Sequence, residues 1–270
     1  MRLKDKVALI TSAAHPCASA IAAGFAREGA DCAIVESQLT KAEQLAAEIR
    51  ALGRRTLGLE IDVTEKAQVE EGVRRAIAEF GHLDILLNCS AVTHESDFLS
   101  FSEESFNDCI ERGPKAYFLF AQAVGRHMAE QRSGKILNLS TTDARVGSGE
   151  STGNSVAYSS IDAMTRAIAQ ALGFYGVNVN SLVCGLLEQN ALSRDEIGER
   201  MRRIPIGRLA RPEDLVGAAI FLATGDSNFV SGESLFVDCG YANAAVTEDG
   251  FRPGWGKVWG PFEIPPNKSS

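Results

Sequence analysis

The sequence lacks the features that would place the protein in a membrane or on a nucleic acid. Its 270 residues contain no apolar run long enough to span a bilayer. The net charge is −8, and no stripe of lysine and arginine stands out against it, which disfavours a polyanionic partner. We therefore expect neither membrane insertion nor nucleic-acid binding.

Signatures of metal sites and disulfides are also missing. The six cysteines form no CxxC pair, and the four histidines show no spacing typical of metal ligands. Most of the cysteines stand among apolar residues, so we expect free thiols packed in the core, in a reducing compartment. The charged N-terminal segment leads straight into an apolar run, which argues against a signal peptide. These features predict a cytoplasmic protein without a bound metal.

The sequence does contain a regular alternation of two patterns. Short apolar runs predict strands at residues 7–11, 32–35, 56–61, 84–88, 135–141, 177–183 and 234–237. Helical periodicity predicts helices at residues 16–28, 40–52, 65–80, 103–131, 154–173 and 212–223. Such alternation predicts a doubly wound, Rossmann-like α/β domain over residues 1–240, with helices on both faces of a parallel sheet.

Residues 241–270 have a different character. They hold both tryptophans and four of the eight prolines, and they show neither helical nor strand periodicity. Phe251, Trp255, Trp259 and Phe262 together carry too much apolar surface to leave in water. We expect an extended arm that packs on its own subunit or on a neighbour.

The C-terminal third carries the most specific family resemblance. The stretch "GVNVNSLVCG" resembles the sixth strand and following loop of the short-chain dehydrogenase/reductase superfamily. The stretch "IPIGRLARPEDLVGAAIFLATGDSNFVSGESLFVDCGY" resembles its closing helix and strand. The resemblance covers about 240 residues and implies the doubly wound fold, but a fold alone does not fix the chemistry.

The first turn departs from the pattern of that superfamily. Its members carry Thr-Gly-x-x-x-Gly-x-Gly, whose glycines let the backbone approach the diphosphate of the cofactor. The aligned residues run from Thr11 to Ala18, and no glycine occurs before Gly24. Pro16 also removes a backbone donor. Losing two charge-assisted hydrogen bonds of about 1.5–3 kcal/mol each would weaken binding about a hundredfold or more.

The positions that contact the adenosine half of a dinucleotide match the family pattern better than the first turn does. The resemblance places Glu36 at a ribose hydroxyl, Asp62 and Val63 at the adenine, and Asn88 at the first position of the family's Asn-Asn-Ala-Gly. If a dinucleotide binds, Glu36 favours NAD over NADP because its carboxylate repels a 2′-phosphate. We expect that this chain binds no cofactor, or binds NAD only weakly, with NAD held by a partner subunit.

The catalytic positions of the family, Asn, Ser, Tyr and Lys, are changed as well. An ungapped alignment places Gly113, Thr141, Asn154 and Tyr158 there, and no lysine occurs between Lys135 and Lys257. An alternative alignment pairs Tyr158 with Asp162, whose carboxylate would raise the pKa of the phenol. The thirteen-residue spacing between Thr141 and Asn154 is normal for the family and favours the ungapped alignment. The pair Gly113-Pro114 also predicts a break in the helix at residues 103–131, and the family's nicotinamide-contacting threonine falls on Gln189.

These departures lead to three hypotheses about function. The first is a non-catalytic subunit in a homo- or hetero-oligomer with an intact family member, which would oxidise an alcohol such as the hydroxyacyl-CoA 2-[hydroxy(phenyl)methyl]succinyl-CoA. The second is a cofactor-independent lyase, cyclase or isomerase that uses Tyr158, Thr141, Asp143, His94 or Tyr117. The third is a divergent NAD-dependent oxidoreductase. Of these possibilities, we do not expect this chain to catalyse a reaction on its own. The expected substrate is a small molecule or an acyl-CoA.

Overall fold

A parallel sheet of seven strands forms the centre of the protein. The computed structural model describes residues 1–89, 94, 96–147, 150–188 and 204–243. The strands are β1 (Val7–Ile10), β2 (Asp31–Glu36), β3 (Thr56–Glu60), β4 (Ile85–Asn88), β5 (Gly134–Thr141), β6 (Val177–Cys184) and β7 (Ser234–Val237). Their order is β3-β2-β1-β4-β5-β6-β7, and every pair is parallel. The predicted doubly wound α/β fold is confirmed.

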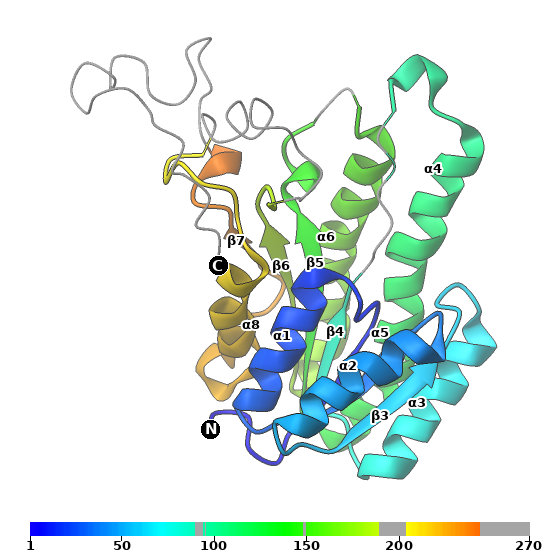
Figure 1. Ribbon diagram of the computed structural model, residues 1–270, viewed down its shortest axis with the longest axis vertical. Coiled ribbons are helices and arrows are strands. Elements are labelled where there is room, and N and C mark those ends of the chain that lie inside the picture. The colour runs from blue at the N-terminus through cyan, green and yellow to red at the C-terminus, as the bar shows by residue number, and fades with distance from the viewer. Residues whose placement is uncertain (90–93, 95, 148–149, 189–203, 244–270) are drawn as a thin grey trace.

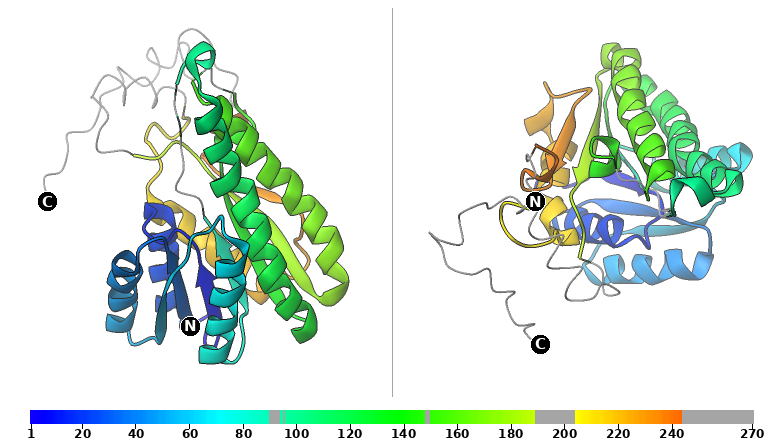
Figure 2. Two further views of the ribbon diagram at one scale, coloured as in Figure 1. Left: turned by 90° about the vertical axis from the view of Figure 1, so that its right-hand side faces the viewer. Right: turned by 90° about the horizontal axis from the view of Figure 1, so that it is seen from above.

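Helices cover both faces of this sheet (Figure 1). The described helices are α1 (Pro16–Arg27), α2 (Leu39–Ala51), α3 (Lys66–Phe80), α4 (Glu103–Ile110), α5 (Ala116–Gln131), α6 (Thr152–Leu172) and α8 (Val216–Ala223). Seen from above, α1, α2 and α8 lie on one side of the strands, and α3, α5 and α6 lie on the other (Figure 2).

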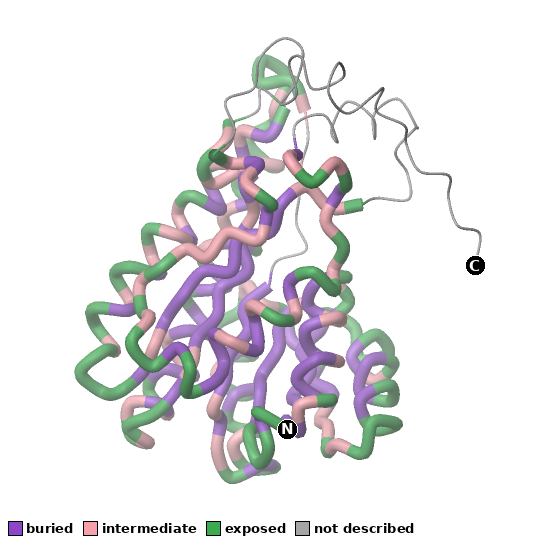
Figure 3. The backbone as a smooth tube through the Cα atoms, turned by 90° about the vertical axis from the view of Figure 1, so that its left-hand side faces the viewer, coloured by how far each residue is buried: buried purple, intermediate pink, exposed green. Residues whose placement is uncertain are grey.

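The alternation of side chains along each strand divides the core into two clusters. Ile10 and Leu87 contact the cluster under α1, α2 and α8. Their chain neighbours Leu9 and Leu86 belong to the opposite cluster, under α3, α5 and α6. Because both faces are covered, β1, β2 and β4 are buried along their whole length, while the edge strands β3 and β7 are partly exposed and the outer faces of the helices are exposed (Figure 3). Continuous apolar runs are what such doubly covered strands require.

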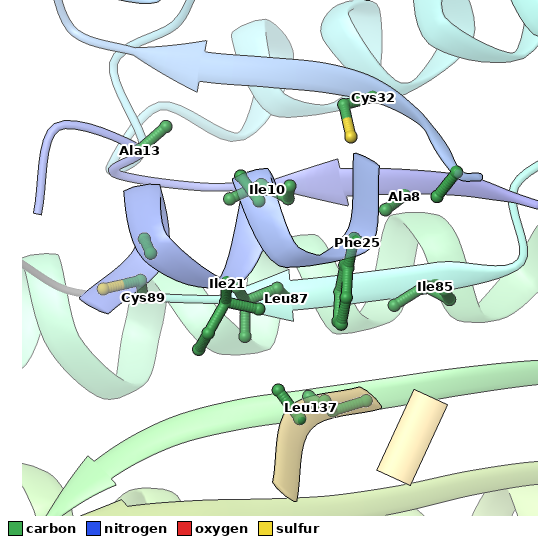
Figure 4. Close-up of a cluster of buried hydrophobic side chains, with 14 of the residues drawn as sticks. Ala8, Ile10, Ala13, Ile21, Phe25, Cys32, Ile85, Leu87, Cys89 and Leu137 are labelled. Carbon is green, nitrogen blue, oxygen red and sulfur yellow. The ribbon is translucent and has the colours of Figure 1, made fainter. Parts of the chain in front are cut away.

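The α1 helix is fastened to the sheet by its apolar stripe. Figure 4 shows Ile21 and Phe25 of α1 lying over β1 and β4. Both side chains are fully buried, and each contributes about 1.5–3 kcal/mol of hydrophobic stabilisation. The start of α1 therefore has a fixed position beyond the end of β1.

The long helix predicted at residues 103–131 is broken in the middle, as the Gly113-Pro114 pair predicts. A π-helical turn spans Glu111–Lys115 and separates α4 from α5. Gly113 has a ψ of −109°, outside the helical region, and Pro114 supplies no backbone donor. The turn lies against α6, where a Cβ added at Gly113 would be 3.4 Å from the Cβ of Ala157.

The direction in which the sheet grows reverses after β3. The chain then places β4 on the other side of β1, so the segments that follow β1 and β4 lead to opposite faces. In open α/β sheets, ligands bind at this reversal, outside the carboxyl ends of the strands. The Thr11 hydroxyl bridges it: Oγ1 accepts from the Cys89 amide at 2.9 Å, and it lies 3.1 Å from the Cys89 carbonyl oxygen.

Two features are absent from the described residues. None of the helices in the described ranges is long and apolar enough to cross a membrane. Across the same ranges, no group of three or more His, Cys, Asp or Glu side chains is placed to hold a metal ion. The predicted arm at residues 241–270 lies, from residue 244 onward, outside the described part of the chain.

Candidate functional site

The turn after β1 keeps a glycine-like backbone without glycine. Ser12 has a φ of +46°, in the left-handed region that glycine usually occupies. Its carbonyl accepts from the His15 amide at 2.9 Å, which closes the turn. Holding a non-glycine residue in such a conformation costs about 1–3 kcal/mol, so the surrounding contacts must stabilise the turn.

Two side chains supply those contacts. The Glu36 Oε1 accepts from the Ala14 amide at 2.6 Å, and the His15 Nδ1 accepts from the Cys17 amide at 3.3 Å as the N-cap of α1. Pro16 occupies the first helical position, where its missing amide costs nothing. The helix therefore begins normally.

His15 lies among thiols at the start of α1. Burial alone would lower its pKa, but the neighbouring Cys89 and Cys17 outweigh burial and raise the pKa of His15 to about 10. The Cys17 thiol has the opposite shift: a hydrogen bond with Cys184 and the contact with His15 outweigh burial and lower its pKa to about 6. Cys17, Cys89 and Cys184 are all buried. Figure 4 shows Cys89 beyond the end of β4.

A cavity of about 480 Å³ opens outside the carboxyl ends of β1, β2 and β3. Its lining combines the first turn with the ends of the next two strands and with charged residues from the helices. The lining residues are Ser12, Ala14, His15, Pro16, Glu36, Ser37, Lys41, Ile61, Asp62, Val63 and Arg112. The structure thus brings together three of the predicted cofactor-binding residues, Glu36, Asp62 and Val63.

Each of the two acids in this cavity has internal partners. Glu36 is 8% exposed and bonded to Ala14 as described above. Asp62 accepts from the amide and the hydroxyl of Thr64, at 3.0 and 2.8 Å, and these bonds lower its pKa. Both carboxylates are therefore fixed in position and face the cavity as acceptors.

Sequence reasoning missed the cations of this cavity. Arg112 comes from the π-helical turn, and its Nε donates to Asp108 Oδ1 at 2.9 Å. Asp108 also contacts the His94 Nε2 at 3.0 Å. Lys41, on α2, also lines the cavity. No sequence motif marks such residues, because they approach the cavity from helix surfaces.

The fourth predicted cofactor residue, Asn88, does not line this cavity. It is fully buried at the end of β4, and its Nδ2 donates to Asn138 Oδ1 at 3.0 Å and to the Tyr117 carbonyl at 3.4 Å. Asn138 in turn donates to Thr165 Oγ1 at 2.8 Å. This chain of polar groups connects β4, β5 and α6 beneath the cleft.

The four positions aligned with the family's catalytic set gather around the start of α6. Asn154 Oδ1 accepts from the His94 amide at 3.2 Å and from the Cys109 thiol at 3.8 Å. Thr141, at the end of β5, accepts from the Asp143 amide at 3.3 Å. Gly113 lies against the same helix.

Tyr158 lies one helical turn after Asn154. It packs with Tyr117 and Ile161 and is 6% exposed. Burial, followed by the charges of Cys89 and Asp143, raises the pKa of its phenol above the ordinary value of 10. Gln189, where the family's threonine aligns, lies outside the described residues.

A second cavity, of about 250 Å³, lies at the ends of β6 and β7. Gly185, Leu186 and Asp238 line it, together with Arg208 and Asp214. Two hydrogen bonds, of 2.6 and 2.8 Å, join these last two side chains. This cavity continues the carboxyl edge of the sheet away from the Glu36 cavity.

Comparison with known proteins identifies relatives over nearly the whole chain. The family model described as "Enoyl-(Acyl carrier protein) reductase" matches residues 13–242. The (2S)-[(R)-hydroxy(phenyl)methyl]succinyl-CoA dehydrogenase subunit BbsD of Thauera aromatica is 35% identical over 89% of this chain and 97% of its own length. The 2-dehydro-3-deoxy-D-gluconate 5-dehydrogenase of Escherichia coli is 32% identical over 88% of this chain and 96% of its own.

Solved structures of dehydrogenases have the same fold as this chain. A gluconate 5-dehydrogenase from Burkholderia cenocepacia, in complex with NADP and tartrate, superposes with a TM-score of 0.87 at 30% identity, over 90% of this chain and 98% of its own. A short-chain type dehydrogenase/reductase from Mycobacterium marinum gives a TM-score of 0.83 at 26% identity, over 88% and 96%.

These findings correct two expectations from the sequence. The prediction of a non-catalytic subunit is wrong, because near-full-length relatives are named as dehydrogenases. The prediction that the chain binds no cofactor is wrong for the same reason, since a 30% identical relative was solved with NADP. The physical error was to equate missing glycines with a missing site, although Ser12 adopts the glycine-like conformation and a cavity remains beside it.

The sheet order, the position of the cavity and the relatives lead to one assignment. The chain belongs to the short-chain dehydrogenase/reductase superfamily.

Proposed function

We propose that this protein is an NAD-dependent oxidoreductase that interconverts a secondary alcohol and a ketone. The observation that carries the proposal is the cavity at the ends of β1, β2 and β3, with Glu36 in its wall. The dehydrogenase relatives support the same reaction class. Bound NAD would supply the hydride acceptor, and the protein would supply binding, orientation and the proton.

The adenosine half of a dinucleotide fits the residues of this cavity. Ile61 and Val63 offer an apolar wall for an adenine, and the Glu36 carboxylate offers acceptors for ribose hydroxyls. Only Oε1 is used in the bond to Ala14, so the second oxygen can accept as well. A 2′-phosphate would meet this carboxylate directly. The cofactor is therefore NAD rather than NADP.

Thr141 and Tyr158 are the groups that we propose for the substrate oxygen. The Thr141 hydroxyl accepts from Asp143, which leaves its own proton free to orient the substrate. The raised pKa of Tyr158 keeps its proton on Oη at neutral pH. A neutral phenol can donate to an oxygen that gains negative charge, which is the requirement of ketone reduction. Alcohol oxidation needs the ionised phenol and should become faster as the pH rises.

The substrate class and the assembly are also proposals. The named substrates of the relatives from T. aromatica and E. coli are an acyl-CoA and a sugar acid, so we propose a substrate with a hydroxyl group and a carboxylate or thioester. The T. aromatica relative is named as a subunit. We propose that this chain works in the cytoplasm, in an oligomer with its own copies or with an intact family member.

Steady-state turnover tests the proposed function. The full-length protein, alone and together with its native oligomeric partner, is supplied with NADH and a panel of ketones that carry a carboxylate or a CoA thioester. We expect substrate-dependent loss of absorbance at 340 nm, faster with NADH than with NADPH. No turnover by either preparation, with protein shown to be folded, would contradict the proposal.

A further inference from the structure

Residues 13–17 of the first turn offer no backbone donors for a diphosphate. From residue 13 to residue 17, each amide either donates within the chain or is missing. The acceptors are the Val35 carbonyl for Ala13, the Glu36 carboxylate for Ala14, the Ser12 carbonyl for His15 and the His15 ring for Cys17, while Pro16 has no amide hydrogen. A dinucleotide that enters this cavity must therefore be bound by other groups.

The cavity also holds two fixed carboxylates. Glu36 and Asp62 both line it, and their hydrogen bonds to Ala14 and Thr64 hold them in place. A diphosphate would add two negative charges beside them. Repulsion between like charges at this range disfavours binding unless cations lie in the same cavity.

Besides Lys41 on α2, two side chains that can carry a positive charge line the cavity and meet this requirement. His15 lies in the first turn and Arg112 in the π-helical turn, and both line the cavity. The bond from Nε to Asp108 fixes the Arg112 guanidinium, and the charge of Arg112 reaches Asp62, whose pKa it helps to lower. An arginine fork suits phosphate oxygens because it donates two hydrogen bonds in one plane.

His15 has a second property that suits an anion. In its neutral form the ring accepts from the Cys17 amide through Nδ1. When the ring takes a second proton, Nδ1 becomes a donor and no longer accepts from the Cys17 amide, so His15 adds a positive charge to the lining of the cavity. The raised pKa of His15 favours this protonated form at neutral pH.

We propose that the side chains of His15 and Arg112, rather than the backbone amides of residues 13–17, bind the diphosphate of the dinucleotide. The inference rests on the proposed function, because it assumes that a nucleotide occupies this cavity. It gives the π-helical turn a binding role. It also makes His94 and Asp108 positioning residues for Arg112.

Calorimetric titrations with adenosine and with ADP test this inference without any turnover. We expect the unmodified protein to bind ADP at least about tenfold more tightly than adenosine. Arg112→Gln and His15→Asn should each weaken ADP binding about tenfold and change adenosine binding less than about twofold. Asparagine is a good N-cap, so the second variant keeps the start of α1.

Matched variants separate charge from folding. Arg112→Lys keeps the charge and should retain most of the ADP affinity. Arg126→Gln removes an arginine that pairs with Glu70 outside the cavity and should change nothing. If Arg112→Gln and His15→Asn leave ADP binding intact, or weaken adenosine equally, the inference is wrong while the nucleotide site stands. If the unmodified protein binds neither ADP nor adenosine, both this inference and the proposed function are wrong.

Discussion

Glu36 links the sheet to the proposed cofactor site. It ends β2 and is almost fully buried, yet it lines the cavity and accepts from the Ala14 amide. The carboxylate therefore fixes the turn after β1 and, in our proposal, also selects the cofactor. The two roles of Glu36 can be separated by a substitution that removes its charge and keeps an oxygen acceptor.

Glu36→Gln should lower the preference for NAD over NADP. The amide oxygen can still accept from Ala14, but the charge that repels a 2′-phosphate is gone. Loss of charge-assisted bonds worth about 1.5–3 kcal/mol should weaken NADH binding at least about tenfold, as measured by NADH and NADPH titrations. Glu60→Gln, at the paired position on β3, is the control. An unchanged cofactor preference in Glu36→Gln would remove Glu36 from the site.

Tyr158→Phe tests the proposed proton donor. Removal of one hydroxyl should lower the rate of ketone reduction by about 10²–10⁴-fold, while the affinity for NADH stays within about twofold. Tyr175→Phe is the control, because Tyr175 lies on the surface beyond α6. An equal rate in Tyr158→Phe and the unmodified protein would show that another group moves the proton.

At the scale of elements, the packing of α3 on the end of β3 determines the shape of the cavity. Gly72 on α3 is buried, and a Cβ there would meet the Ile61 side chain. Ile61 is itself a lining residue of the cavity. The absence of a side chain at position 72 therefore gives Ile61 its place in the wall.

Gly72→Ala should destabilise the protein although alanine is the better helix former. We expect the free energy of unfolding to fall by about 1–3 kcal/mol, because the added methyl group overpacks the contact with Ile61. Gly217→Ala, at an exposed position of α8 with no atom within 4 Å of the new Cβ, should raise it by up to about 1 kcal/mol. Urea unfolding measures both. Equal effects of the two substitutions would contradict the packing described for Gly72.

An ion cluster attaches the start of β2 to the segment before β3. Asp31 accepts from the amide and Nε of Arg55, at 3.1 and 2.8 Å, and lies 2.7 Å from Arg54 Nη2. Burial opposes its charge, but these bonds outweigh burial and hold the pKa of Asp31 below its usual value. A carboxyl whose pKa is lower in the folded state stabilises the fold above its unfolded pKa, near 4, and this contribution is lost as the pH falls through the lowered value.

Asp31→Asn should therefore reduce stability in a pH-dependent way. At pH 7 we expect a loss of about 1–3 kcal/mol in the free energy of unfolding. The difference from the unmodified protein should shrink below about pH 4. Urea titrations at pH 7, 5 and 3.5 measure it, with Glu43→Gln in the exposed pair with Arg50 as the control. A pH-independent difference would contradict the role of the charge.

At the scale of the whole molecule, the fold could be predicted because the central strands are buried on both faces. The run at Val7–Ile10, for example, is wholly apolar and buried because helices cover both sides, so the sequence pattern predicts it closely. The break between α4 and α5 could be predicted from Gly113 and Pro114 alone. Glu36, Asp62 and Val63 could be predicted to meet, because parallel strands end at one edge of the sheet.

The rest of the site depends on tertiary contacts that leave no local pattern. Arg112 lines the cavity from the π-helical turn, and nothing in the sequence shows that its side chain reaches the ends of β1, β2 and β3. The conformation of Ser12 could not be read from the residue type, since serine rarely adopts a positive φ. This is why the comparison of motifs alone led to the wrong expectation of a chain without cofactor or catalysis.

Equilibrium binding of NADH to the purified full-length protein is the most direct test of the proposed NAD site. Nicotinamide fluorescence is followed while NADH is titrated at pH 7. We expect a saturable enhancement with a dissociation constant below about 1 mM, equivalent to a binding free energy stronger than about −4.1 kcal/mol, and competition by ADP. A linear signal without saturation, from protein whose circular dichroism shows an intact fold, would contradict it.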